Sequence, residues 1–159
     1  MENERTFIVG DIHGCLDVLK RLMDKIHWRP DEDRLIFLGD YIDRGADSRG
    51  VVDYVMEISK ESSLVQCLLG NHENILLDFL STGDPRLLLI NGGITTLESY
   101  QVANERGDEP LIPRDHVAFF QKLLLYIELD DCYVVHAGFR PGVEVDKQSL
   151  EDLIWIREP

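Results

Sequence analysis

The chain has 159 residues, of which 44% are hydrophobic, and its formal net charge at pH 7 is −14. This length favours one domain with its own core, and the negative charge argues against nucleic-acid binding, which needs a basic surface. No apolar run approaches the roughly 18 residues of a membrane span, the charged N-terminal segment is not typical of a signal peptide, and three scattered cysteines indicate a reduced, cytoplasmic protein.

The N-terminal half alternates between short apolar runs and amphipathic stretches. The periodicity predicts three strands and three helices, in chain order at residues 6–9, 16–26, 35–38, 51–58, 64–69 and about 74–80. Ser48 is the candidate N-cap of the second helix. The repeated order of strand, loop and helix predicts an α/β fold with a parallel sheet, in which sites form beyond the carboxyl ends of the strands.

The C-terminal half is less regular. Helices are predicted for 86–90, for 95–100 and from Asp115, as the cap, through Leu125. Residues 103–113 are polar and contain glycine and proline, so we expect a mobile loop or lid. A β-hairpin is predicted with strands at 126–129 and 132–135.

A polar motif follows each of the first three predicted strands and the second strand of the hairpin. In chain order the motifs are Gly10-Asp11-Ile12-His13-Gly14, Gly39-Asp40-Tyr41-Ile42-Asp43-Arg44-Gly45, Gly70-Asn71-His72-Glu73 and His136-Ala137-Gly138. One Asp-X-His after a strand is more often a capped turn than a metal ligand. Three such motifs, each after a predicted strand, together with a further histidine, rarely coincide by chance, so they predict one shared site.

The side chains in these motifs are suited to divalent metals. Asp11 and His13 are two residues apart and project to the same side of an extended backbone. Asp40 can bridge two cations with its two oxygens, Asn71 offers an amide oxygen, and His136 offers an imidazole. The set suits manganese, iron, nickel or zinc better than calcium. Two such cations about 4 Å apart commonly activate water for phosphoryl transfer.

The four motifs, in this order, resemble those of the calcineurin-like metallophosphoesterases, and within them the bacterial phosphoprotein phosphatases related to the lambda-phage enzyme. The resemblance covers about residues 6–158. It implies one metallophosphoesterase domain over residues 1–159, built as a sandwich of two mixed β-sheets flanked by helices. It also implies two bound divalent metal ions, with manganese as the first expectation and iron, zinc or nickel as alternatives.

The resemblance assigns a role to each motif. The metal ligands would be Asp11, His13 and Asp40 for the first metal, and Asp40, Asn71 and His136 for the second. His72 would be the general acid, oriented by Asp43, and Arg44 would bind the phosphate as a planar cationic fork. Arg157 is similar to a second phosphate-binding arginine of the lambda-type enzymes.

One part of the family pattern does not occur in this chain. The family has a downstream Gly-His-Thr motif whose histidine completes the second metal site, and no such motif precedes Pro159. We therefore expect that the C-terminal part of the family's domain is absent, either because the chain is a fragment or because a partner supplies the rest. An exposed sheet edge would follow.

Three functions remain open at this point. The first is a metal-dependent protein phosphatase acting on phosphoserine or phosphothreonine in a phosphoprotein or phosphopeptide, with phosphotyrosine and aryl phosphates as further substrates. The alternatives are a diadenosine tetraphosphatase-like nucleotide hydrolase and a catalytically weak binding or regulatory fragment. The Asp43-Arg44 pair and Glu73 favour the first, because the tetraphosphatases typically lack that pair and carry aspartate where Glu73 stands.

Overall fold

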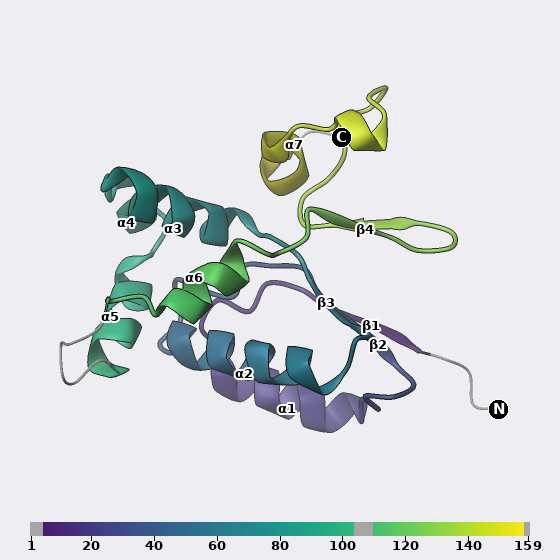
Figure 1. Ribbon diagram of the computed structural model, residues 1–159, viewed down its shortest axis with the longest axis horizontal. Coiled ribbons are helices and arrows are strands. Elements are labelled where there is room, and N and C mark those ends of the chain that lie inside the picture. The colour runs from purple at the N-terminus through teal and green to yellow at the C-terminus, as the bar shows by residue number, and fades with distance from the viewer. Residues whose placement is uncertain (1–4, 104–109, 158–159) are drawn as a thin grey trace.

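The computed structural model describes residues 5–103 and 110–157 (Figure 1). Its elements in chain order are β1 (Thr6–Val9), α1 (Leu16–Ile26), β2 (Arg34–Phe37), α2 (Ser48–Glu61), β3 (Val65–Cys67), α3 (Asn71–Thr82), α4 (Arg86–Ile90), α5 (Ile94–Ala103), α6 (Arg114–Phe120), β4 (Tyr126–Glu128), β5 (Tyr133–Val135), the 3₁₀ helix η1 (Val145–Lys147) and α7 (Leu150–Trp155). Most of the predicted lid at 103–113 lies outside the described residues. Within the described ranges, no helix has both the length and the apolar composition that crossing a membrane requires.

The first three strands form a parallel sheet in the order β1-β2-β3. The central strand β2 is buried on both faces, and its side chains alternate between two cores. Leu35 and Phe37 pack into the main core with residues of α1 and α2. Ile36 points the other way and packs with Ile127 and Val134 of the β4–β5 hairpin. The predicted α/β fold with a parallel sheet is therefore confirmed.

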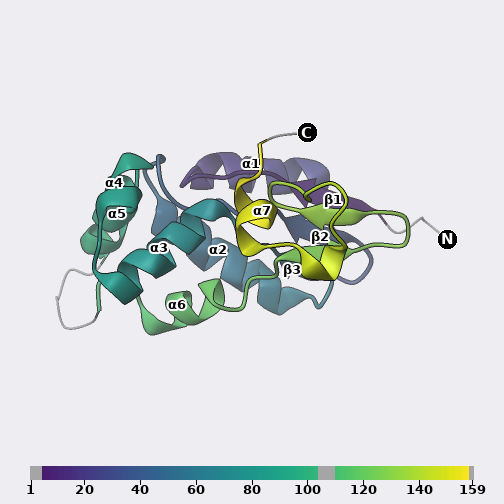
Figure 2. The same cartoon turned by 90° about the horizontal axis from the view of Figure 1, so that it is seen from above.

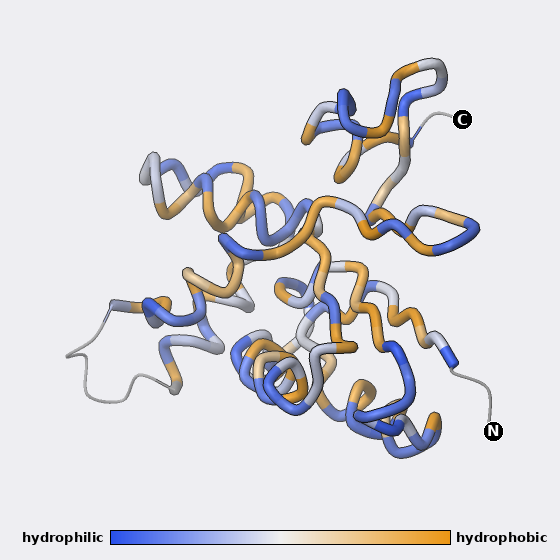
Figure 3. Tube along the Cα trace, turned by 45° about the vertical axis from the view of Figure 1, so that its right-hand side comes forward, coloured by the Kyte–Doolittle hydropathy of each residue, from blue (hydrophilic) through white to orange (hydrophobic). Residues whose placement is uncertain are grey.

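The layers follow from this alternation. α1 and α2 lie on one face of the sheet, and the β4–β5 hairpin and α7 lie over the other (Figures 1 and 2). Hydrophobic residues run through the strands, whereas the helices alternate between hydrophobic and hydrophilic residues (Figure 3). This amphipathic pattern is expected for helices that cover a sheet with one side and face water with the other.

The sheets differ from the two mixed sheets that the family resemblance implies. Within the described ranges, the three-stranded sheet is wholly parallel and the β4–β5 pair is antiparallel. One parallel bridge between Leu68 and Leu124 links the segment after β3 to the segment before β4. β1 occupies an edge of the parallel sheet, where Ile8 is 51% exposed.

Two helix starts differ from the predictions. The N-cap of α2 is Asp47, whose side chain accepts a hydrogen bond of 2.9 Å from the backbone N–H of Gly50. Ser48, the predicted cap, is buried and directs its hydroxyl toward the backbone N–H of Asp43. α3 begins at Asn71 and not at Asn74, because the polar motif after β3 is itself the first helical turn.

Helix α6 is shorter than predicted. It spans Arg114–Phe120 with Pro113 at the N-cap position, so Asp115 lies in the first turn and is not the cap. The chain leaves the helix before Leu124 because that residue pairs with the extension of β3. Its N–H donates to Cys67 O at 2.9 Å, and its carbonyl accepts from the N–H of Leu69 at 2.8 Å. The predicted β-hairpin that follows is confirmed.

An ion-pair cluster beside β2 provides a test of stability. Asp33 is buried and accepts hydrogen bonds from the guanidinium groups of Arg29 and Arg5, which hold its pKa well below the usual range. A lowered pKa in the folded state means that stability is fully present above the ordinary aspartate pKa of about 3.9 and is lost as pH falls toward the lowered value.

We therefore expect Asp33→Asn to lower the free energy of unfolding at pH 7. The difference between the two proteins should shrink as the pH is lowered below about 4, because Asp33 of the unfolded parent takes up a proton there while folded Asp33 stays charged, which favours unfolding of the parent. Urea unfolding at several pH values measures this difference. A deficit that stays constant with pH would show that packing, and not the carboxylate charge, stabilises this corner of the fold.

Candidate active site

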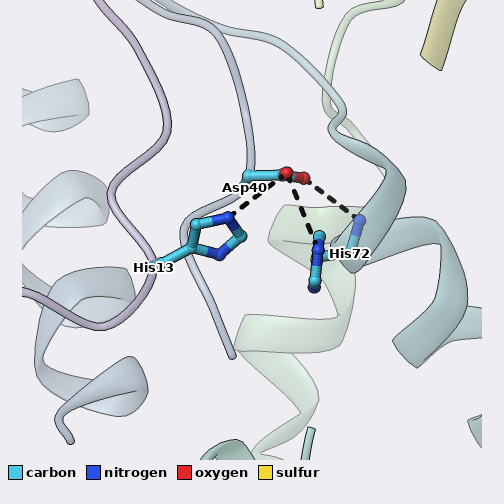
Figure 4. A group of neighbouring side chains, drawn as sticks. All are labelled: His13, Asp40 and His72. Atoms are coloured by element: carbon cyan, nitrogen blue, oxygen red, sulfur yellow. Dashed lines mark hydrogen bonds and ion pairs between the residues drawn. The ribbon is translucent and has the colours of Figure 1, made fainter. Parts of the chain in front are cut away.

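The loops that follow β1, β2 and β3 bring Asp11, His13, Asp40 and the start of α3 to one edge of the sheet. In Figure 4 the imidazoles of His13 and His72 both face the carboxylate of Asp40. Glycine permits this approach, because a Cβ atom at Gly70 would lie 2.2 Å from Asp40 Oδ1.

Asp40 is buried at the centre of the site, and its two oxygens face different partners. Oδ2 lies 3.6 Å from His13 Nε2 and 3.9 Å from His72 Nε2. Oδ1 lies 3.7 Å from His136 Nε2 and accepts a hydrogen bond of 3.1 Å from the backbone N–H of His72. Asp11 also belongs to this cluster, because its Oδ2 lies 3.9 Å from His13 Nε2. A carboxylate placed in this way can bridge two cations.

His13 tests whether the site fits a metal. Its Nδ1 lies 2.8 Å from the carbonyl oxygen of Ile42, which can only accept, so Nδ1 carries the proton. Nε2 of the neutral ring then has a lone pair that is buried and has no hydrogen-bond partner. This lone pair faces Asp40, whose carboxylate is also an electron-pair donor. Two such donors directed at the same space fit a bound cation.

His136 shows the same arrangement on the other side of Asp40. Its Nδ1 lies 2.8 Å from the carbonyl oxygen of Leu38, which leaves a lone pair on Nε2 of the neutral ring. Nε2 lies 3.0 Å from Asn71 Oδ1, a second acceptor. An imidazole nitrogen, an amide oxygen and a carboxylate without any thiolate form a donor set for a divalent first-row metal.

The acidic and imidazole ligand atoms fall into two groups that share Asp40. Atoms lying within 4.8 Å of one another join His13, Asp40 and His72 in one group and Asp11, Asp40 and His136 in the other. The sequence-based assignment had instead paired Asp11 with His13. The five predicted ligands are thus brought together, while their division between two metals stays a prediction.

His72 differs from His13 because both of its ring nitrogens are occupied. Nδ1 lies 2.7 Å from Asp43 Oδ2 and donates to it, since a carboxylate can only accept. Nε2 lies 3.0 Å from Arg44 Nη2 and accepts from it. His72 and Asp43 are buried, whereas Arg44 is exposed. This environment suits an oriented proton donor beside an anion-binding arginine better than it suits a metal ligand.

The backbone of these loops is strained. His13, Asp40, Asp43 and Arg44 have φ angles of 45°, 53°, 70° and 68°. Non-glycine residues rarely adopt this left-handed region, and such strain concentrates at functional sites. His27, at the end of α1, is the remaining non-glycine example among the described residues.

The role of Glu73 was missed by the sequence analysis. Its buried carboxylate accepts hydrogen bonds of 2.8 Å from the backbone N–H groups of Asp40 and Tyr41, which fixes the turn that carries Asp40. Burial, and then the charge of Asp40, raise the pKa of Glu73 to about 8. Its position three residues after Gly70 was an available signal, because a glutamate there reaches back to backbone N–H groups at a helix start.

Thr96 was also missed. It lies on α5, and its hydroxyl is 2.5 Å from Asp43 Oδ1. The two residues are 53 positions apart in the chain, and Thr96 belongs to none of the polar motifs. A single threonine in a helix gives no sequence signal of its own.

Arg157, the predicted second phosphate-binding arginine, is not brought into the cluster. It is exposed and lines a surface hollow with residues of and beside α7, none of which belongs to the site around Asp40. α7 does lie beside the loop after His136, since the N–H of Ala137 donates to Leu153 O at 2.9 Å. The role of Arg157 stays a prediction.

Comparison with known proteins identifies the family. The profile of the calcineurin-like phosphoesterases matches residues 4–158, so the chain belongs to this family of metallophosphoesterases. The family likeness agrees with the donor set around Asp40, which holds the ligand types that a dinuclear divalent-metal site needs.

The similar proteins include a protein phosphatase and nucleotide hydrolases. Serine/threonine-protein phosphatase 1 of Salmonella typhimurium is 38% identical over 87 residues, which cover 55% of this chain and 38% of that protein. The symmetrical bis(5'-nucleosyl)-tetraphosphatase of Pseudomonas entomophila is 35% identical and covers 96% of this chain and 49% of that protein. A crystal structure assigned as a diadenosine tetraphosphatase has a TM-score of 0.67 and 27% identity, covering 95% of this chain and 61% of that one. The chain therefore spans only part of the length of these relatives.

Proposed function

We propose that the chain carries the dinuclear metal site of a hydrolase that cleaves phosphoric anhydrides in dinucleoside tetraphosphates. The observation that carries the hydrolytic chemistry is the convergence of imidazole and carboxylate electron-pair donors on Asp40, where the buried Nε2 of His13 has no hydrogen-bond partner. The substrate class is supported by the tetraphosphatase relative that covers 96% of this chain. This was the alternative in the sequence analysis, and it now takes precedence over the protein phosphatase.

The site residues would have three roles, namely metal binding, phosphate binding and proton transfer. Asp11, His13, Asp40, Asn71 and His136 would hold two divalent cations, which when bound supply Lewis acidity to the phosphoryl group and the attacking water. Arg44 is exposed and presents a planar fork to the phosphate. Binding phosphate draws Arg44 away from His72 Nε2, which frees this nitrogen to carry a proton. Asp43 keeps the ring of His72 oriented for donation to the leaving oxygen.

Arg44→Ala is expected to raise KM and to lower kcat, because the arginine contacts the phosphate in both the ground state and the transition state. A hydrogen bond to a charged group contributes about 1.5–3 kcal/mol, so kcat/KM should fall about 10- to 100-fold. Steady-state kinetics and product inhibition by inorganic phosphate measure both effects. Arg86→Ala, which removes an exposed arginine paired with Asp84, is the control. An unchanged KM and unchanged phosphate inhibition would contradict the role of Arg44.

A second candidate function is the hydrolysis of phosphoserine or phosphothreonine in proteins. The buried Asp43–His72 pair favours it, because a serine alkoxide is a much poorer leaving group than a nucleoside diphosphate and gains more from a positioned acid. The Salmonella phosphatase relative supports the same candidate over 55% of the chain.

The two candidates are separated by assaying one manganese-loaded preparation with a symmetrical dinucleoside tetraphosphate and a phosphoserine peptide. We expect kcat/KM to be higher for the tetraphosphate, and no activity with either substrate in the presence of a chelator. A higher kcat/KM for the peptide would replace the first proposal by the second. No turnover of either substrate by protein with two metals bound would contradict both. An Asp40→Asn preparation purified in parallel excludes contaminating phosphatases.

A further inference from the structure

We propose that Thr96 is a positioning residue for the proton donor. Its hydroxyl would fix the carboxylate of Asp43, and through Asp43 it would orient the imidazole of His72. This inference rests on the proposed function and deepens it, because it extends the proton-donating unit from two residues to three and adds helix α5 to the site.

The contacts of Asp43 carry this inference. Its side chain is buried, and each carboxylate oxygen has a hydrogen-bond donor from a different helix. Oδ2 accepts from His72 Nδ1 of α3 at 2.7 Å, and Oδ1 lies 2.5 Å from Thr96 Oγ1 of α5. Thr96 is itself buried. The carboxylate is thus held at both ends, which prevents rotation about its terminal bond.

The single proton of the Thr96 hydroxyl has two possible acceptors. Asp43 Oδ1 lies at 2.5 Å and Ser48 Oγ at 3.0 Å. The carboxylate is closer and charged, so it takes the proton. The same hydroxyl oxygen accepts from the backbone N–H of Asp43 at 2.8 Å. Thr96 therefore holds both the main chain and the side chain of one residue.

Ser48 cannot replace Thr96. The backbone N–H of Asp43 also lies 3.1 Å from Ser48 Oγ, so it keeps an acceptor when the threonine hydroxyl is removed. Oδ1 of the carboxylate loses the donor from Thr96 and is left in a buried environment. Asp43 would then turn to recover a partner, and the His72 ring would follow it because the two are hydrogen-bonded.

The consequence for the reaction is limited to the leaving group. When the phosphorus–oxygen bond breaks, the leaving oxygen takes its proton from His72 Nε2, while Asp43 stays ionised and Thr96 keeps its own proton. A misdirected imidazole slows this transfer but does not alter the metal ligands or Arg44. The defect should therefore grow with the basicity of the leaving group.

Thr96→Val and Thr96→Ser test this inference. Both are measured in metal-loaded protein on nitrophenyl phosphate, which has a good leaving group, and on phenyl phosphate, which has a poorer one. Acid catalysis contributes about 100- to 10,000-fold, so we expect Thr96→Val to lower kcat on phenyl phosphate about 10- to 100-fold. Its effect on nitrophenyl phosphate should stay within about threefold, with little change in KM. Thr96→Ser keeps the hydroxyl and should restore both rates.

Two further variants complete the design. Thr96→Ala also removes the hydroxyl but places no methyl group against the carboxylate, and it replaces Thr96→Val if that variant does not fold. Thr82→Val makes the same chemical change at the exposed end of α3, where the hydroxyl bonds to neighbouring backbone. It should leave both rates unchanged.

The outcomes separate this inference from the proposed function. Equal losses on the two substrates, or a defect that Thr96→Ser does not correct, would make Thr96 merely structural and overturn the inference. A leaving-group effect in His72→Asn that is absent in Thr96→Val would overturn it as well. If His72→Asn itself shows no leaving-group effect, the proton-donor role in the proposed function fails first, and the inference about Thr96 falls with it.

Discussion

Asp40→Asn is expected to abolish metal-dependent hydrolysis while leaving the protein folded. The substitution preserves the shape of the side chain and keeps an oxygen that can accept from the N–H of His72. It removes the negative charge that lies within 4 Å of three histidine nitrogens. Changes in residues that merely orient metal ligands typically cost about 10- to 100-fold in metal affinity, so the loss of the shared ligand should exceed that.

Calorimetric titration with manganese and metal analysis of the purified protein measure the loss of metal affinity. Circular dichroism and thermal unfolding test whether the variant stays folded. His13→Ala should give the same result, because it removes the unpartnered Nε2. Asp130→Asn, which changes an exposed aspartate near the hairpin turn, is the control. Turnover close to the parent in Asp40→Asn, with metal content confirmed, would contradict the dinuclear site.

His72→Asn is expected to lower kcat more than it affects substrate affinity. The asparagine cannot donate a proton to the leaving oxygen, and acid catalysis typically contributes about 100- to 10,000-fold. The loss should approach this range for a phosphoserine peptide or phenyl phosphate and should be much smaller for nitrophenyl phosphate. The leaving group of the latter departs without help from an acid.

Steady-state kinetics on the three substrates, combined with metal analysis, decide what His72 does. Unchanged metal content with a leaving-group-dependent loss would support the proton-donor role. Equal losses on all substrates, accompanied by reduced metal content, would show instead that His72 is a metal ligand. The structure allows this comparison because His72 lies 3.9 Å from Asp40 Oδ2, close to the predicted metal position.

Much of the fold followed from hydrophobic periodicity. The short apolar runs before the Asp11, Asp40 and Asn71 motifs are strands of one parallel sheet. The run that forms β2 is the clearest of them, because a strand buried on both faces leaves few polar positions. The positions of the motifs also predicted that they lie close together, since the carboxyl ends of parallel strands meet at the same edge of the sheet. Helix boundaries were less accurate, as at α6, because the pairing of Leu124 with β3 ends that helix and is not visible in local sequence.

The supporting residues could not be predicted in the same way. Glu73 acts through backbone N–H groups of a turn more than 30 residues away, and Thr96 acts on Asp43 across 53 residues. Neither contact depends on a spacing that repeats along the chain. The position of Glu73 in the helix start predicts a contact with Gly70 alone, so its bonds to Asp40 and Tyr41, like the bond of Thr96 to Asp43, are revealed by the packing of α3 and α5 in the folded protein.

The left-handed backbone at His13, Asp40, Asp43 and Arg44 implies a conflict between activity and heat resistance. Each such residue costs of order 1–3 kcal/mol, while the net stability of a domain is only about 5–15 kcal/mol. Glycine adopts this conformation without the steric cost. Selection for thermal tolerance alone would therefore favour glycine at positions such as Arg44, whose side chain is exposed, and the resulting proteins would be more stable but less active.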